Sequence, residues 1–179
     1  MGLYMLTGEY NITLDEMGRI ALPRKMRDGL KENYIILSKG ADHCLWLYTP
    51  DYWKQQADDI VNNTDEFSDY GRLMRQIFIG TSQECDIDKQ GRILIPPSLR
   101  SKVGLSRDCV LLGQVHYFEI WADDHYKAHL DASRENYKTG LKELSSLRMK
   151  KKDLGNGGNR SFSGAAGANA GVSGTEEQP

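Results

Sequence analysis

The sequence predicts a mainly β protein with flanking α-helices, in which two copies of one small module are related by a pseudo-twofold axis within the chain. Three observations predict this fold: an internal repeat, short strands of alternating polarity in each copy, and a helical segment that closes each copy. Each copy has about 45 residues, which is below what a single core usually supports. We therefore expect the two copies to interleave their hairpins and to bury one shared, barrel-like core.

The internal repeat has a constant offset of 73 residues. Residues 14–23 (LDEMGRIALP) align with residues 87–96 (IDKQGRILIP), and the match continues until Arg27 aligns with Arg100. A two-residue insertion in the second copy is later compensated by a deletion, so that the strands which follow align at the original offset. Because a chance match would not recover its offset, we interpret the two segments as copies of one module.

Each copy begins with a predicted β-hairpin. A short alternating strand precedes the sequence Asp-x-x-Gly-Arg, where glycine accepts a positive φ and aspartate can accept hydrogen bonds from nearby backbone N–H groups. A second strand follows and ends at a proline, which has no N–H to donate to a sheet. The hairpin strands are expected at residues 10–14, 19–22, 83–87 and 92–95.

A short basic helix, two further strands and a longer helix complete each copy. Proline suits the first turn of the short helix, and an acidic residue suits the first turn of the longer one. The further strands are expected at residues 34–38, 44–48, 109–113 and 117–121, and the longer helices at residues 51–61 and from residue 123 onward.

The order of these elements predicts five segments along the chain. Between the copies, apolar residues recur at helical spacing from about Thr64 to Ile79, which predicts a connecting helix. After the last helix, a stretch rich in Gly, Ala, Ser and Asn lacks apolar periodicity, and we expect it to be disordered. The segments are a first module at 9–53, a connecting helix at 54–81, a second module at 82–125, a C-terminal helix at 126–152 and a Gly-rich tail at 153–179.

The distribution of charge bears on nucleic-acid binding. The net charge is −2 and the pI about 6.1, whereas DNA-binding proteins commonly carry a basic surplus that neutralises phosphates. However, residues 18–31 hold five cations and one acid, and residues 89–107 hold five cations and no acid. Acidic residues gather instead within residues 51–69. This segregation weakens the objection to a DNA-binding function.

Arg19 and Arg92 are the leading candidates for contact with DNA bases. Each opens the second strand of a hairpin, where an arginine can present its planar fork to guanine O6 and N7 or to phosphate. The alternative is an ion pair with Asp15 or Asp88 that only stabilises the turn. We assign these two aspartates mainly to the turn, because a carboxylate directed at DNA would repel phosphate.

The remaining candidate residues lie on the short helices and in the turns. Cations on the short helices are candidates for phosphate contacts that position the protein, and a solvated surface is the alternative. These cations are Arg24, Lys25, Arg27, Arg100 and Lys102. The residues assigned to the turn motif are Asp15, Gly18, Asp88 and Gly91.

The two Asp-x-x-Gly-Arg segments, each followed by Ile-x-Leu/Ile-Pro, resemble the swapped-hairpin module of the AbrB and SpoVT regulators. Two such modules in one chain resemble the MraZ family of bacterial transcriptional regulators, over roughly residues 5–145. The resemblance includes residues 76–80, 110–113 and 118–121. One copy of the motif would be weak evidence, but two copies at a fixed separation with matching flanks are specific.

This resemblance implies a duplicated AbrB-like swapped-hairpin β-barrel that acts as a sequence-specific transcriptional repressor associated with the nucleoid. It implies binding of double-stranded DNA at short repeated promoter elements of a cell-division and cell-wall gene cluster, and self-association into a ring of identical subunits. In the family the arginine of each signature contacts DNA, which here implies Arg19 and Arg92. Two features depart from the family: the Gly-rich tail is longer, and Pro97 replaces the cation found at Arg24, so that the two copies need not contact DNA equally.

Other classes of function find little support in the sequence. There is no Walker loop, nucleophile elbow or paired-carboxylate site, so we expect no catalytic residue, no cofactor and no small-molecule substrate. His125 and His129 have i, i+4 spacing but lack the glutamate of an HExxH motif and a third ligand, so we expect solvent-exposed histidines and no metal. The alternatives are an antitoxin-like module of the same fold that sequesters a protein partner, and a metal-dependent enzyme centred on these histidines.

Cellular location and core packing follow from the apolar residues. Neither a secretory signal nor a membrane-spanning run is found, so we expect a cytoplasmic protein with no membrane partner. The three cysteines lie in or beside apolar runs and are expected to be buried free thiols. We expect the tryptophans to pack in the core rather than to form a base-stacking platform. These residues are Cys44, Cys85, Cys109, Trp46, Trp53 and Trp121.

Overall fold

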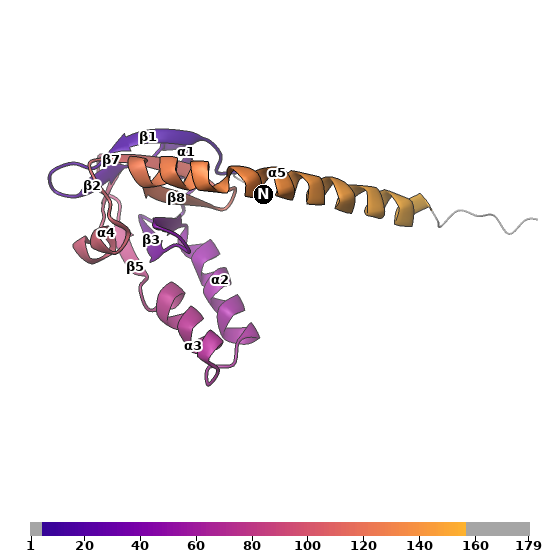
Figure 1. Ribbon diagram of the computed structural model, residues 1–179. Coiled ribbons are helices and arrows are strands. Elements are labelled where there is room, and N and C mark those ends of the chain that lie inside the picture. Colours follow the sequence, from indigo (N-terminus) through magenta and orange to yellow (C-terminus); the bar gives the residue numbers. More distant parts are fainter. Residues whose placement is uncertain (1–4, 157–179) are drawn as a thin grey trace, which may run out of the picture. The chain divides into compact units, whose positions relative to one another are not determined.

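The computed structural model describes residues 5–156 (Figure 1). The chain divides into two compact units, one up to Ala132 and one from Ser133. All the strands of the described residues lie in the first unit, and the last helix runs across the boundary. The strands are β1 (Glu9–Thr13), β2 (Arg19–Ala21), β3 (Tyr34–Lys39), β4 (Cys44–Tyr48), β5 (Gln83–Asp86), β6 (Arg92–Leu94), β7 (Asp108–Gly113) and β8 (Tyr117–Ala122). The helices are α1 (Arg24–Arg27), α2 (Pro50–Asn63), α3 (Asp69–Met74), the π-helical η1 (Arg75–Ile79), α4 (Pro97–Val103) and α5 (Asp123–Asn156).

The main sheet has the pseudo-twofold symmetry that the repeat predicts. Its six strands lie in the order β1-β7-β8-β4-β3-β5, and exchange of the two copies maps this order onto itself. The first strand of each copy pairs with the third strand of the other copy, as β1 with β7 and β5 with β3. At the centre, Trp46 lies opposite Glu119, which is its own counterpart at the offset of 73 residues. The hairpins are therefore interleaved, as expected.

The expected closure into a barrel is wrong. The six-stranded sheet ends at β1 and β5, and the second strand of each copy leaves it to form a separate two-stranded ribbon, β2 with β6. These strands have only three residues each, and Pro23 or Pro96 follows within two residues. Because proline cannot donate to a ladder, neither strand is long enough to bridge the outer edges of the sheet.

One core is shared by both copies beneath the sheet and the ribbon. The largest fully buried side chains come from both copies and include Ile20, Leu37, Leu45, Ile93 and Phe118. Removal of these apolar side chains from water is the main favourable contribution to folding. Neither copy could form this core alone, because both copies contribute side chains to the same buried cluster.

The cysteines and tryptophans are packed largely as expected. Cys44, Cys85 and Cys109 are buried free thiols, and burial raises the pKa of the Cys85 and Cys109 thiols to about 11. Trp121 is buried, whereas Trp46 and Trp53 are partly buried. These two pack against a second apolar cluster formed by Ile36, Tyr48 and Phe78.

The segment assigned to the connecting helix, residues 54–81, contains the two helices expected at 51–61 and from about Thr64 to Ile79, although the second starts later and ends in a π-helical turn. It consists of α2, α3 and η1, because the chain becomes extended at Thr64 and a new helix starts with Ser68 as its N-cap. Ser68 Oγ accepts a hydrogen bond from the N–H of Gly71, whose lack of a side chain allows close approach to the carbonyl of Asp65. Thr64 therefore ends α2, and the serine N-cap starts a new helix.

The last helix is longer than the predicted segment 126–152. It starts at Asp123 and continues to Asn156, so the first residues assigned to the tail are helical. The prediction of disorder for residues 157–179 falls outside the described residues. None of the helices in the described part combines the length and apolar character needed to span a bilayer.

Candidate nucleic-acid interface

The two-stranded ribbon places both signature arginines on one surface. In the β2–β6 register, Ile20 lies opposite Ile93, and both are buried in the core. Because side chains alternate along a strand, the neighbouring positions face outward. Arg19 and Arg92 therefore lie on the outer face of the same ribbon, together with Ala21 and Leu94, and the side chain of Leu94 is 50% exposed. The two hairpins, which are 73 residues apart in the sequence, thus form one continuous ribbon surface.

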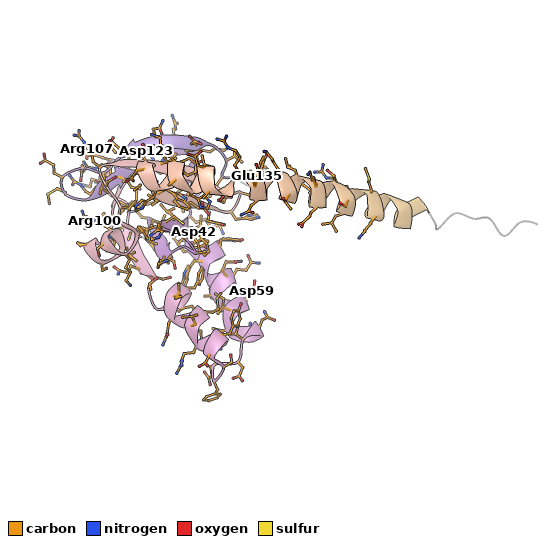
Figure 2. The ribbon with its side chains drawn as sticks, in the orientation of Figure 1. Asp42, Asp59, Arg100, Arg107, Asp123 and Glu135 are labelled. Carbon is orange, nitrogen blue, oxygen red and sulfur yellow. The ribbon has the colours of Figure 1, made fainter. Side chains whose placement is uncertain are left out.

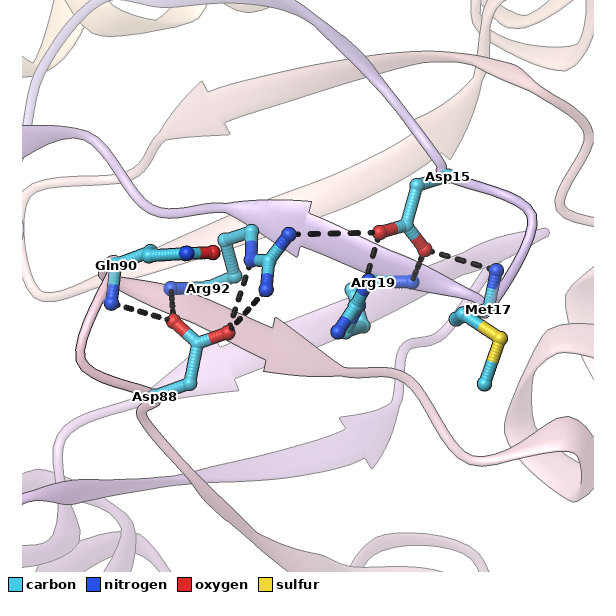
Figure 3. Close-up of polar contacts among 6 residues, drawn as sticks. All are labelled: Asp15, Met17, Arg19, Asp88, Gln90 and Arg92. Atoms are coloured by element: carbon cyan, nitrogen blue, oxygen red, sulfur yellow. Dashed lines mark hydrogen bonds and ion pairs between the residues drawn. The ribbon is translucent and has the colours of Figure 1, made fainter.

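Each turn is organised by its aspartate, as Figure 3 shows. Asp15 Oδ1 accepts hydrogen bonds from the backbone N–H groups of Met17 (3.0 Å) and Arg19 (2.8 Å). Asp88 does the same with the N–H groups of Gln90 (2.8 Å) and Arg92 (2.9 Å). The turn glycines have positive φ, +80° at Gly18 and +75° at Gly91, a conformation that is accessible to glycine at little cost.

The second oxygen of each aspartate holds the arginine side chain. Arg19 Nε lies 2.8 Å from Asp15 Oδ2, and Arg92 donates to Asp88 Oδ2 from Nε (2.9 Å) and lies 2.8 Å from it at Nη2. Arg92 Nη1 also lies 3.9 Å from Asp15 Oδ2, so that one guanidinium links the two turns (Figure 3). The ion pair that the sequence offered as the alternative role is therefore present.

The ion pair fixes the direction of each guanidinium without covering it. The side chains of Arg19 and Arg92 are 33% and 29% exposed. Within residues 5–156, Arg19 forms its side-chain hydrogen bond through Nε alone. Its two terminal nitrogens, the pair that recognises guanine or phosphate in a bidentate way, remain available. Both terminal nitrogens of Arg92 lie near carboxylates, with Nη2 at 2.8 Å from Asp88 Oδ2 and Nη1 at 3.9 Å from Asp15 Oδ2. The carboxylate in this arrangement holds the guanidinium in one direction.

Acid is expected to destabilise the turns. The pKa of Asp15 is lowered, first by the backbone N–H of Arg19 and further by the Arg19 side chain, and the pKa of Asp88 is lowered in the same way by Arg92. A carboxyl group whose pKa is lower in the folded protein stabilises the fold above its unfolded pKa, and this contribution is lost as pH falls through the folded value.

The test of this acid sensitivity is thermal unfolding of the wild type and of an Asp15→Asn/Asp88→Asn variant across pH. We expect the wild type to have the higher Tm at neutral pH and the difference to shrink below about pH 4, where unfolded aspartates become protonated. A Tm difference that is independent of pH would show that the two carboxylates contribute nothing through their charge.

The helix cations are spread around the turns in unequal ways. Arg24 is 85% exposed with Asp28 at 3.5 Å, and Lys25 donates to Thr7 Oγ1 at 3.3 Å. Lys102 is exposed on α4. Arg27 and Arg100 differ from these, because each guanidinium lies against the turn of the other copy, at Gly91 and Gly18 respectively. The structure therefore brings Arg19, Arg92, Arg27 and Arg100 to the two turns.

Two matching clefts border the turns, each formed by both copies. One, of about 590 Å³, lies between residues 13–16 of the first copy and residues 105–107 of the second. The other, of about 440 Å³, lies between the second turn and Arg27 to Asn33 of the first copy. Glu16 lines the first cleft, and its counterpart Lys89 lines the second. The two ends of the candidate interface therefore differ in charge.

Three further cations line these clefts, namely Lys89, Lys31 and Arg107. The sequence shows them only as members of the basic segments and does not by itself place them at the site. The offset of 73 residues pairs Glu16 with Lys89, and this reversal of charge was the signal in the sequence. Arg100 and Arg107 lie at the part of the first unit that carries α4, well apart from Asp59 on α2 (Figure 2). Asp59, one of the acidic residues within 51–69, is therefore remote from these two cations.

The histidines are less exposed than expected. His125 and His129 are half-buried, with ring centroids 5.4 Å from the ring of His43 and 4.7 Å from the ring of Trp121. The two imidazole rings contact different aromatic partners, so they do not converge on one point as the two ligands of a metal ion would. Within the described residues, no group of three or more His, Cys, Asp or Glu side chains is placed to hold a metal ion.

Comparison with known proteins agrees with the duplicated architecture. The family described as "MraZ protein, putative antitoxin-like" matches residues 5–72 and 77–146, one match for each copy. The chain belongs to the MraZ family. The two matched segments together cover both turns and both basic helices.

The similarity to relatives in this family extends over nearly the whole length of each relative. A protein of Treponema denticola is 38% identical over 142 residues, which are 79% of this chain and 99% of the relative. A Treponema pallidum protein is 33% identical, with 79% and 95% covered, and a Ligilactobacillus salivarius protein is 37% identical, with 74% and 92% covered. All three are named transcriptional regulator MraZ, and none of the three names describes an enzyme.

Proposed function

We propose that this protein regulates transcription by binding double-stranded DNA through the outer face of the β2–β6 ribbon. The observation that carries this proposal is the position of Arg19 and Arg92 on one outward surface, each oriented by a turn aspartate. The names of the relatives support regulation of transcription. On this proposal the protein is a regulator and not an enzyme.

The ribbon suits the major groove of DNA. The groove is wide enough to admit a two-stranded ribbon, and the common specific contact there is an arginine fork on guanine O6 and N7. Arg19 and Arg92 would make such base contacts, while Arg24, Lys25, Arg27, Arg100 and Lys102 would contact or approach the phosphates. Leu94, which is 50% exposed and lies opposite Arg19 in the ribbon, would add an apolar group of the kind that contacts a thymine methyl.

The finer aspects of the proposal come from the family resemblance. They are repression at short repeated promoter elements of a cell-division and cell-wall gene cluster, association with the nucleoid, and assembly into a ring of identical subunits. Assembly would compensate for a modest basic charge, because linked units bind with a raised effective concentration. Exposed apolar side chains on and beside α3, among them Phe67, Tyr70 and Leu73, provide a surface suited to contact between subunits.

The proposal is tested by fluorescence anisotropy with a duplex from upstream of the protein's own gene and a shuffled duplex of the same composition. We expect tighter binding to the first duplex and a strong decrease in affinity as salt rises. Sedimentation of the same samples reports the oligomeric state. Equal affinity for the two duplexes would exclude sequence-specific binding, and a monomer that binds with unchanged affinity would exclude the role of assembly.

The charge difference between the two clefts predicts opposite effects of two matched substitutions. Lys89→Glu is expected to weaken DNA binding and to lower the slope of log K against log salt by about 1, because one phosphate contact is lost. Glu16→Lys, at the equivalent position of the first copy, is expected to strengthen binding and raise the slope by a similar amount. Lys54→Glu on α2 changes charge equally but lies outside the proposed surface, and serves as the control. If all three substitutions change affinity only according to net charge, the clefts do not face DNA.

The antitoxin-like alternative is favoured by one observation, the description of the matched family. On this alternative the same fold sequesters a protein partner, and DNA binding is secondary. The two functions separate in an Arg19→Ala/Arg92→Ala variant. Loss of DNA binding with loss of repression in cells supports the regulator, whereas loss of DNA binding with full biological activity supports sequestration of a protein.

A further inference from the structure

The short basic helix of each copy contacts the turn of the other copy. A Cβ added at Gly18 would lie 2.6 Å from Arg100 Cζ, and a Cβ added at Gly91 would lie 2.5 Å from Arg27 Nη1. Arg27 and Arg100 are counterparts at the offset of 73 residues, as are Gly18 and Gly91. The guanidinium of each copy therefore lies directly over the turn glycine of the other copy, in both halves of the molecule.

Backbone hydrogen bonds tie the same segments together. The N–H of Leu22 donates to the carbonyl of Gly91 at 2.9 Å, and the N–H of Ile95 donates to the carbonyl of Gly18 at 2.9 Å. Each turn is thus anchored to the strand end that leads into the basic helix of the other copy. The two clefts are built in the same way, with a turn from one copy facing a helix-to-strand loop from the other.

The position of Arg100 is held in spite of an unfavourable environment. Its Nε is buried and has no hydrogen-bond partner among the described residues, and an unpaired buried donor is destabilising. Its guanidinium also places a cation against Gly18, the residue that precedes Arg19 in the chain. The contact with the adjacent turn is thus the one specific contact of this guanidinium among the described residues.

We propose that each DNA-contact site is composite: Arg100 of the second copy completes the site of Arg19, and Arg27 of the first copy completes the site of Arg92. This inference rests on the proposed DNA-binding function. Arg27 and Arg100 are positioning residues, because they lie on the turn backbone and set how far the adjacent signature arginine projects. They also concentrate positive charge at the turn of the other copy. Each therefore acts on the signature arginine of the other copy and not on that of its own copy.

The test is a set of double-mutant cycles measured as DNA affinity by fluorescence anisotropy. The cross-copy variants are Arg19→Ala/Arg100→Ala and Arg92→Ala/Arg27→Ala. The matched controls within one copy are Arg19→Ala/Arg27→Ala and Arg92→Ala/Arg100→Ala. Coupled residues give non-additive effects, whereas distant residues give additive effects.

We expect the cross-copy pairs to be non-additive. Once Arg19 is replaced, loss of Arg100 is expected to weaken binding by less than about 3-fold further, whereas loss of Arg27 weakens binding by its full single-variant factor. The salt dependence provides a second readout that a purely structural role would not change. Arg100→Ala is expected to lower the slope of log K against log salt by more in the wild type than in the Arg19→Ala background.

The controls separate the possible failures. Each variant is compared by Tm, and if Arg100→Ala lowers Tm it is replaced by Arg100→Met, which keeps an unbranched apolar side chain. If neither Arg19→Ala nor Arg92→Ala alters DNA affinity, the proposed function fails. If both weaken binding but the coupling occurs within one copy, or in no pair, the composite sites are refuted while the DNA-binding function stands.

Discussion

Replacement of both Arg19 and Arg92 by alanine is expected to remove most of the sequence-specific affinity for promoter DNA. Loss of one bidentate arginine contact costs about 1–3 kcal/mol. Because every 1.4 kcal/mol is a factor of ten, the double variant should bind at least about 30-fold more weakly than the wild type. Fluorescence anisotropy with promoter and shuffled duplexes measures this loss. Affinity for the shuffled duplex should fall much less, since phosphate contacts carry non-specific binding.

The control for charge is Arg19→Lys/Arg92→Lys, which retains both cations but not the planar fork. We expect it to keep the salt dependence of binding and to lose the preference for promoter DNA. The turns should persist in both variants, because Asp15 and Asp88 still accept hydrogen bonds from backbone N–H groups. A lysine variant with full specificity would show that the arginines act as point charges and do not recognise a base.

Phe118→Ala is expected to have the largest effect on stability. Phe118 is fully buried in β8, lies opposite Leu47 of β4, and has its ring 6.2 Å from that of Tyr10. Truncation of a buried phenylalanine commonly costs about 3–5 kcal/mol, through lost burial and the cavity left behind. Denaturant unfolding followed by tryptophan fluorescence and far-UV circular dichroism measures the loss.

The shared core predicts that this unfolding is a single transition for both copies. Leu45→Ala, at the equivalent position of the first copy, is expected to lower the free energy of unfolding by about 2–5 kcal/mol in the same transition. Coincident curves from both probes would agree with one cooperative unit. Two separate transitions, with Phe118→Ala affecting only one of them, would contradict the interleaved fold.

Much of the fold could be predicted from the repeat, because a module too small for its own core has few ways to bury its hairpins. The offset that pairs Ile20 with Ile93 was enough to expect a pseudo-twofold axis and exchanged strands. The sequence did not show that β2 and β6 would leave the sheet. That outcome depends on how far strands of three residues can reach before Pro23 and Pro96, which is a matter of three-dimensional distance.

The candidate site could be predicted in part. The signature Asp-x-x-Gly-Arg was enough to place Asp15 in a turn with Arg19 nearby, because this local geometry follows from residues close in sequence. The contacts of Arg27 with the second turn and of Arg100 with the first turn could not be predicted from the sequence, because each joins residues from different copies. The contact of His125 with His43 is hidden for the same reason. To predict contacts between the two copies, one must know the register in which β4 pairs with β8, and the repeat alone does not specify it.

The covalent fusion of the two copies has consequences for how the molecule can evolve. The first strand of each copy finds its partner strand in the same polypeptide, so folding does not depend on protein concentration as it does in an obligate dimer. Most importantly, a substitution alters one half only, as the pair Glu16 and Lys89 illustrates. A molecule with unlike halves can distinguish the two directions along a duplex, which a symmetric homodimer cannot do.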